Sequence, residues 1–224
     1  MEQNAEAAPS GYSALKDKQR AVRDGFPDAF GLRIHRAISW LGRAEQEAED
    51  DDVRFILLWV GFNAAYGGDV GAEITGERSA FKRYLDTLAA LDRSGRLHNA
   101  VWERFPHEIR LVLDNKYLFG PFWNHVNGVD GYESWAEWFE GSRRRAAAAM
   151  RGRETTRMLF ILFDRLYVLR NQLMHGSATW NSSANRAQVR DGSAVMSWLL
   201  PVFLDIMMDN PHRDWGRPFC PVVA

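Results

Sequence analysis

The sequence predicts an all-α protein, and three observations carry that prediction. Apolar residues recur at helical spacing along most of the chain, and glycines and prolines fall at the ends of the periodic segments. No segment shows the alternation that is typical of a strand. The 224 residues are 46% hydrophobic and include nine Trp and thirteen Phe, which is enough to bury a substantial core.

The first two expected helices lie in the N-terminal part of the chain. A helix is predicted at about 29–49, where five apolar side chains fall near one stripe: Leu32, Ile34, Ala37, Ile38 and Leu41. The acids of 49–52 then complement the positive end of a second helix. That helix, "VRFILLWVGFNAAYGG", ends at Gly67 and Gly68 and is apolar nearly all round, which predicts a central place in a bundle.

The middle of the chain is less regular. An amphipathic helix is expected at 79–92 with Ser79 as its N-cap. Two shorter helical pieces follow, divided by Pro106. Glycine and proline then predict a loop over 120–132, and the next helical stretch is expected to be interrupted by Gly141.

The C-terminal part contains the strongest periodicity. A long helix is predicted at 155–175, followed by a polar loop at 176–192. The last helix is expected at 193–210, kinked or locally broken near Pro201.

These elements predict one main domain. Residues 1–10 are expected to form a disordered tail, and 11–210 a single helical domain with a less regular helical insertion at about 70–150. Residues 211–224, which are rich in proline, are expected to form an irregular C-terminal tail.

Composition excludes several function classes. The net charge of −1 argues against a general polyanion binder. Cys220 is the one cysteine, so an intramolecular disulfide and a cysteine zinc site are excluded, and a reducing cytoplasm fits. The N-terminus lacks the pattern of a signal peptide, and the longest apolar run is too short to span a bilayer. We therefore expect a cytoplasmic protein without a membrane partner.

Charge is nevertheless segregated along the chain. Residues 45–52 hold six acids and no base, whereas 141–170 hold eight arginines and two acids. Arginine binds phosphate in a forked geometry, so this strip is a candidate RNA-binding surface. Its candidate residues are Arg143, Arg144, Arg145, Arg151, Arg153 and Arg157. A solvated helix face explains the same pattern equally well.

Most catalytic motifs are missing from the sequence. It contains no glycine-rich phosphate loop and no HExxH motif. Glu103 and His107 are four residues apart, but Pro106 breaks the helix that would align them as metal ligands. Ser177 lacks the context of a nucleophilic serine. We therefore expect neither a metal nor another cofactor.

The stretch "LRNQLMHGS", 169–177, remains as the candidate active site. On a straight helix Asn171 and His175 are about 40° apart and share a face, whereas Arg170 and His175 are about 140° apart. Arg170 and His175 therefore converge only if the helix stops at Gly176, or if two copies of the chain pool their motifs across a two-fold axis.

Arginine and histidine together suit metal-independent cleavage of RNA. Histidine titrates near neutrality and can take a proton from a ribose 2′-hydroxyl or give one to a leaving oxygen. Arg170 would bind the phosphate, and Asn171 would bind the phosphate or orient His175. An ordinary helix C-terminus explains the same residues, because cations and a following glycine are favourable there.

A resemblance to a known family favours the interpretation of 169–177 as an active site. The segment "RNQLMHG" matches the Arg-x4-His motif of the HEPN superfamily, including the polar residue that often follows its arginine. "LLWVGFNAAYG" at 57–67 resembles the W-x-x-F-N-x-x-Y helix of the Apea-like HEPN branch. "HGSATWNSSANRAQVRDG" resembles that branch's loop after the histidine, and "SWLLPVFLDIM" resembles its closing helix. The resemblance covers roughly 29–67 and 155–210.

The resemblance implies a dimeric HEPN-type helical bundle in which the motifs of two protomers face each other. Many members are metal-independent endoribonucleases of toxin–antitoxin, antiviral or RNA-processing systems. By position, Arg170 and His175 correspond to the catalytic pair and Asn171 to the supporting polar residue. Asn63 is an amide inside an apolar helix, so it either braces the backbone or supports the motif.

The sequence departs from the family pattern at one position, and two alternative functions remain. Some HEPN toxins carry a tyrosine two residues after the histidine, where a partner enzyme modifies it, but this chain has Ser177 there. An antitoxin or regulatory protein acting by that route is therefore not supported. Other HEPN domains are inactive modules, which would bind a nucleotide, RNA or a partner protein. A weaker alternative is duplex-DNA binding through 141–157, but no helix-turn-helix is recognisable.

Overall fold

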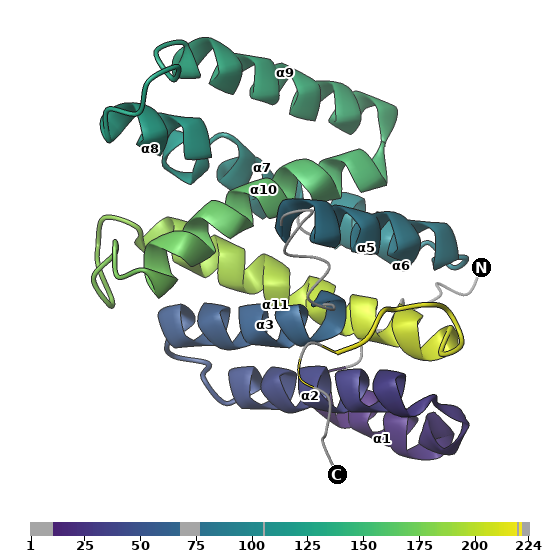
Figure 1. Cartoon of the computed structure of the whole chain (residues 1–224). Helices are drawn as coiled ribbons and strands as arrows, with labels where there is room; N and C mark the ends of the chain where they lie inside the picture. The colour runs from purple at the N-terminus through teal and green to yellow at the C-terminus, as the bar shows by residue number, and fades with distance from the viewer. Residues whose placement is uncertain (1–10, 68–76, 105, 219, 221–224) are drawn as a thin grey trace, which may run out of the picture.

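The computed structural model describes residues 11–67, 77–104, 106–218 and 220, and these form helices without any strand (Figure 1). The predicted all-α class is confirmed. The α-helices are α1 (Tyr12–Val22), α2 (Asp28–Glu45), α3 (Asp51–Tyr66), α5 (Glu77–Leu91), α6 (Arg96–Asn99), α7 (Pro106–Leu113), α8 (Gly120–Val126), α9 (Trp135–Gly152), α10 (Thr155–Met174) and α11 (Arg186–Asp209). Short turns complete the described chain: 3-10 helices at Arg23–Gly25 and Lys116–Leu118, and a π-helical turn at Ala100–Arg104.

The helices stack in layers around α3 and α11. Figure 1 shows α1 and α2 on one side of this pair, α5 and α10 on the other, and α9 outermost. Side chains from all of these layers pack into one continuous apolar cluster, to which α9 contributes only through its inner face. Gly192 of α11 allows this close packing, because a Cβ there would lie 2.8 Å from a methyl of Leu169 in α10.

Helix α3 is central, as its all-round apolar sequence predicts, and polar groups hold both of its ends. Asp50 caps the start by accepting a hydrogen bond of 3.0 Å from the Val53 N–H. At the other end the buried guanidinium of Arg33 donates to the carbonyls of Ala65 at 2.9 Å and Gly67 at 2.6 Å. Burial lowers the pKa of Arg33. The predicted start and stop of this helix are confirmed.

Two sequence predictions about the insertion are wrong. Residues 120–126 form helix α8 rather than a loop, because Pro121 lies in the first turn, where a proline needs no N–H partner. Helix α9 runs unbroken through Gly141, because a single glycine costs only about 1 kcal/mol in a helix whose neighbours are strong helix formers.

Two helix boundaries also differ from the prediction. Ser79 lies inside α5, which begins at Glu77, so Ser79 is not its N-cap. Helix α11 begins at Arg186 and continues through the buried Pro201, so the predicted loop is shorter and the helix is not broken there. Burial of nearly the whole helix compensates the hydrogen bond that a proline removes. The predicted disorder of residues 1–10 lies outside the described residues.

Helix α11 is, among the described helices, the one long and apolar enough to cross a membrane by length and composition. However, 78% of its most apolar 18-residue window is buried inside the bundle. It packs against α3, α2 and α7, which is the position of a core helix.

Four charged side chains tie α1 and α6 to the end of α11. Lys18 Nζ lies 2.5 Å from Asp205 Oδ1 and 2.6 Å from Asp209 Oδ1. Arg96 Nη1 lies 2.8 Å from Asp209 Oδ2 and also pairs with Asp205. Burial on its own would raise the pKa of Asp209, but the hydrogen bonds and charges of Lys18 and Arg96 outweigh it and lower that pKa.

We expect Asp209→Asn to lower the free energy of unfolding at pH 6. This loss should become smaller as the pH falls towards 2. The folded state binds the proton of Asp209 less readily than the unfolded state does. Its contribution is therefore complete above the ordinary carboxyl pKa of about 4 and is lost as the pH falls through the lowered pKa. Urea denaturation across this range measures the effect. Asp24→Asn is the control, because that side chain is fully exposed, and an equal loss at pH 6 and pH 2 would contradict the prediction.

Candidate functional site

The candidate motif occupies the last turn of α10, and the helix stops there as predicted. His175 is the C-cap, and Gly176 follows in the left-handed region with φ of +68°. The N–H of Gly176 donates to the carbonyl of Leu173 at 3.3 Å, and the N–H of Ser177 donates to that of Gln172 at 2.9 Å. This is a Schellman C-cap, which turns the chain away directly after His175. The imidazole is exposed.

Arg170 is paired with its neighbour and not with the histidine. Its Nη1 donates to Asn171 Oδ1 at 2.9 Å, and its guanidinium lies 5.8 Å from the ring centroid of Tyr167. Its Nε is buried and has no hydrogen-bond partner among the described residues. The single protomer thus brings Asn171 to Arg170 and leaves His175 apart, as the angular separation on the helix predicts.

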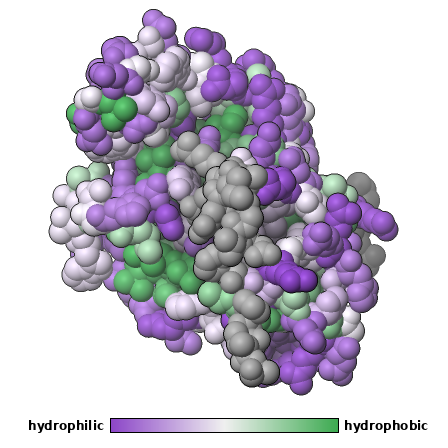
Figure 2. Space-filling view, viewed as in Figure 1, coloured by the Kyte–Doolittle hydropathy of each residue, from purple (hydrophilic) through white to green (hydrophobic). Residues whose placement is uncertain are grey.

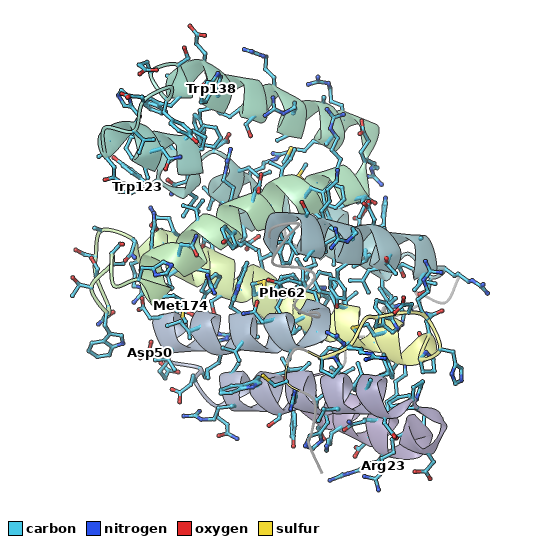
Figure 3. All side chains as sticks on the ribbon, in the orientation of Figure 1. Arg23, Asp50, Phe62, Trp123, Trp138 and Met174 are labelled. Carbon is cyan, nitrogen blue, oxygen red and sulfur yellow. The ribbon has the colours of Figure 1, made fainter. Side chains whose placement is uncertain are left out.

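A cavity of about 910 Å³ opens at this end of α10. Asn171, Gln172 and His175 form one side of it, whereas Arg170 is not among the lining residues. The turn before α8, α8 itself and the loop between α10 and α11 form the other sides. Figure 3 shows Trp123 on α8 and Met174 at the end of α10 at the same edge of the molecule.

Contacts of two residues, Tyr117 and Arg165, hold α8 and α9 against α10. The carbonyl of Tyr117 accepts hydrogen bonds of 2.7 Å from both the Gln172 amide and the Trp123 indole. Deeper in the fold, Arg165 of α10 is 3% exposed and donates to Ser142 Oγ of α9 at 2.9 Å. Its guanidinium also lies 4.6 Å from the ring centroid of Phe119, a cation–π contact. The wall that carries Trp123 is therefore fixed relative to the motif.

The opposite wall, the loop after His175, is anchored to the start of α3. The Trp180 indole donates to Asp50 Oδ2 at 2.8 Å, and Arg186 pairs with the buried Asp52 at 2.6 Å. Burial would raise the pKa of Asp50, but hydrogen bonds from the Val53 N–H and Trp180 outweigh it and lower that pKa. Asp50 therefore stays ionised and keeps the loop in place at neutral pH.

The structure does not bring Asn63 to the motif. It lies near the C-terminal end of α3, and about 18 Å of helix separates it from the start of α3, where the loop after His175 is anchored. Its Oδ1 is buried and accepts no hydrogen bond from a described residue. Its supporting role remains a prediction.

The six candidate RNA-binding arginines are exposed but lie away from His175. Five are on α9 or directly after it, and Arg157 in the first turn of α10 is about 27 Å from His175 along that helix. Arg143 pairs with Asp114 at 2.8 Å, and Arg157 pairs with Glu154 at 3.1 Å. Exposed pairs of this kind contribute less than about 1 kcal/mol, so the arginines stay available to phosphate.

Among the described residues, no three His, Cys, Asp or Glu side chains gather as a metal site would require.

Comparison with family models, with curated proteins and with solved structures finds no match for this chain. Fold and site together define an α-helical bundle with an open cavity, lined by aromatic and amide side chains, at an Arg-x4-His helix end.

The sequence analysis did not identify the wall of this cavity that α8 and its flanking turns form. Tyr117, Trp123 and Tyr132 line it, yet the segment that holds Trp123 and Tyr132 was expected to be a loop and was not connected with the site. Its sequence, "YLFGPFWNHVNGVDGY", carries a usable signal, because it is rich in aromatic and amide side chains. Gln172 was also missed, although it lies inside the motif.

Proposed function

We propose that this protein is a metal-independent endoribonuclease of the HEPN type that acts as a homodimer. The observation that carries the proposal is the position of His175: an exposed imidazole at a tightly capped helix end, beside Asn171 and facing an open cavity. The order of the segments that resemble the Apea-like branch supports the same assignment.

The residues suit the chemistry of RNA cleavage. The ribose 2′-oxygen attacks the adjacent phosphorus, the bond to the 5′-oxygen breaks, and the products end in a 2′,3′-cyclic phosphate and a 5′-hydroxyl. His175 would move a proton in this step, either from the 2′-hydroxyl or to the leaving 5′-oxygen. Arg170 would bind the phosphate, with its guanidinium oriented by Asn171 Oδ1.

A second protomer would complete the site. Arg170 and His175 are separate in one protomer, whereas a two-fold axis at the end of α10 would bring the arginine of one chain to the histidine of the other. From the resemblance we further propose a cytoplasmic role in a toxin or phage-defence system, with an antitoxin or regulatory protein as a partner.

The experiment is an RNA cleavage assay in EDTA with the wild type and with His175→Ala. We expect the wild type to cut single-stranded RNA without metal and to leave 2′,3′-cyclic phosphate ends, and the variant to lose this activity. Cleavage that requires Mg²⁺, or that survives in His175→Ala, would refute the proposal.

One observation favours a second function. Because Arg170 is already bonded to Asn171, the same cavity would suit an inactive HEPN module that binds a nucleotide, RNA or a partner protein. Such a module would bind its ligand through this cavity without turnover under any metal condition.

A further inference from the structure

We infer that the cavity beside His175 is a binding site for an unpaired base of single-stranded RNA. The inference rests on the proposed function, because it takes RNA as the ligand. It adds a base-binding site, built by the insertion around α8, to a motif that on its own contacts only the phosphate and the ribose.

The wall that α8 and its flanking turns contribute is aromatic. Tyr117, Trp123 and Tyr132 line the cavity. Trp123 is held by its hydrogen bond of 2.7 Å to the Tyr117 carbonyl and by the ring of Phe122 at 5.1 Å. Trp123 and Tyr132 are half-buried, so each ring keeps an accessible part. Fixed aromatic rings with free faces are what bases stack on in single-stranded complexes.

Amide groups come from all of the walls, including that of α8. Six amide side chains line the cavity: Asn124, Asn127, Asn171, Gln172, Asn185 and Gln188. Each amide offers both donors and an acceptor, which matches the edge of a base.

Asn185 is the most informative of these amides. Both of its side-chain polar atoms, Oδ1 and Nδ2, are buried and have no hydrogen-bond partner among the described residues. Unpaired buried polar atoms are costly, so a ligand edge towards which the Asn185 side chain turned, and with which these atoms then paired, would gain affinity.

The charge of the cavity lining favours a base over the other parts of a nucleic acid as the ligand. Among the described residues, the lining contains no Asp, Glu, Lys or Arg, and His175 is its one basic side chain. A phosphate deep in the cavity would meet no arginine or lysine, whereas a neutral base would leave no charge unpaired. The geometry thus places the base in the cavity and the adjoining phosphate at the rim beside His175.

The surface around the cavity fits a strand rather than a duplex. A base reaches such a cavity only when it is unstacked and unpaired. Figure 2 shows apolar atoms at the surface near α8, where Val126 is 55% exposed and Val129 is 48% exposed. Neither valine lines the cavity, but Val126 directly precedes Asn127, which does. Apolar surface at this place suits the faces of neighbouring bases better than it suits the phosphates of a helix.

The test measures RNA binding in the His175→Ala background, so that no cleavage disturbs it. Fluorescein-labelled 12-nucleotide RNA is titrated in EDTA and followed by anisotropy. We expect Trp123→Ala and Tyr132→Ala each to weaken binding by about 5-fold or more, because that is the effect of losing one stacked base. Trp123→Phe should retain most of the affinity. Trp40→Ala, an exposed tryptophan on α2, is the matched control and should bind unchanged.

Two further probes decide whether a base is bound. An abasic ribose-phosphate oligomer and double-stranded RNA of the same length should both bind more weakly than the single strand. Equal binding of either probe, or unchanged affinity in both Trp123→Ala and Tyr132→Ala, would overturn the inference. Circular dichroism shows whether each variant is folded, and Tyr132→Ala keeps the test valid if Trp123→Ala does not fold.

The failure of this inference is distinguishable from that of the proposed function. If the wild type cleaves RNA while the Trp123 and Tyr132 variants bind and cleave normally, the base site is refuted and the ribonuclease stands. If these variants lose binding but the wild type never cleaves, the base site stands and the ribonuclease is refuted.

Discussion

A mixture of Arg170→Ala and His175→Ala protomers is expected to cleave RNA, although each variant alone is inactive. In a composite site the arginine comes from one chain and the histidine from the other. A mixed dimer therefore contains one intact site and one site that lacks both residues. With random pairing of equal amounts, about a quarter of the wild-type activity should return. The activity of each variant alone should be lower by about 100-fold or more, the usual cost of losing an acid–base group (His175) or a donor that stabilises charge on the phosphate (Arg170).

The geometry of one protomer is the reason for this expectation. The Arg170 guanidinium is bonded to Asn171 and contacts Tyr167, while His175 lies beyond the end of the helix and faces the cavity. If both residues acted within one chain, every protomer in the mixture would lack one of them and no activity would return. A cleavage assay after unfolding, mixing and refolding the two variants measures the outcome. The double variant Arg170→Ala/His175→Ala, mixed with either single variant, is the control and should stay inactive.

Hydrophobic pattern was sufficient to predict the central helices. The all-round apolar sequence of 53–66 allows only a buried position, and Asp50 and Gly67 limit the helix at each end. The stop of α10 was equally readable, because Gly176 supplies the positive φ that a Schellman cap requires.

Helix α8 and the middle of α9 were predicted wrongly because local signals were taken as decisive. Pro121 and Gly141 were both treated as breakers. Their effect depends on position within a helix and on packing, and contacts with α10 through Arg165 override the weak local preference. Such contacts join residues far apart in the chain, and no local pattern contains them.

The same limit applies to the candidate site. The motif itself was found from sequence, and so was the separation of Arg170 from His175 on the helix. The cavity was not found, because it depends on Tyr117 accepting hydrogen bonds from both Gln172 and Trp123, a meeting of two distant segments. The arginine strip leads towards His175 along the chain but not in space, since the last candidate residue, Arg157, lies in the first turn of α10, at the opposite end of that helix from His175.

Phe62→Ala is expected to cause the largest loss of stability, about 3–5 kcal/mol in the free energy of unfolding. The side chain is fully buried, and Figure 3 labels it near the middle of the view. Its ring lies 4.7 Å from that of Phe163 in α10 and 6.1 Å from that of Phe203 in α11, so its removal leaves a cavity among three helices. Since small domains have only about 5–15 kcal/mol of stability, this loss should be plain in a urea titration at fixed protein concentration.

Two comparisons assign that loss to the core rather than to the site. Phe62→Leu fills most of the space and should lose much less, whereas Trp40→Ala on the exposed face of α2 should change stability by under about 1 kcal/mol. Below the temperature at which Phe62→Ala unfolds, its RNA cleavage per folded molecule should match the wild type, because Phe62 is not among the residues that line the cavity. A loss below about 1 kcal/mol would mean that this ring is not close-packed. A loss of cleavage in the folded variant would mean that the core and the site are coupled through α10.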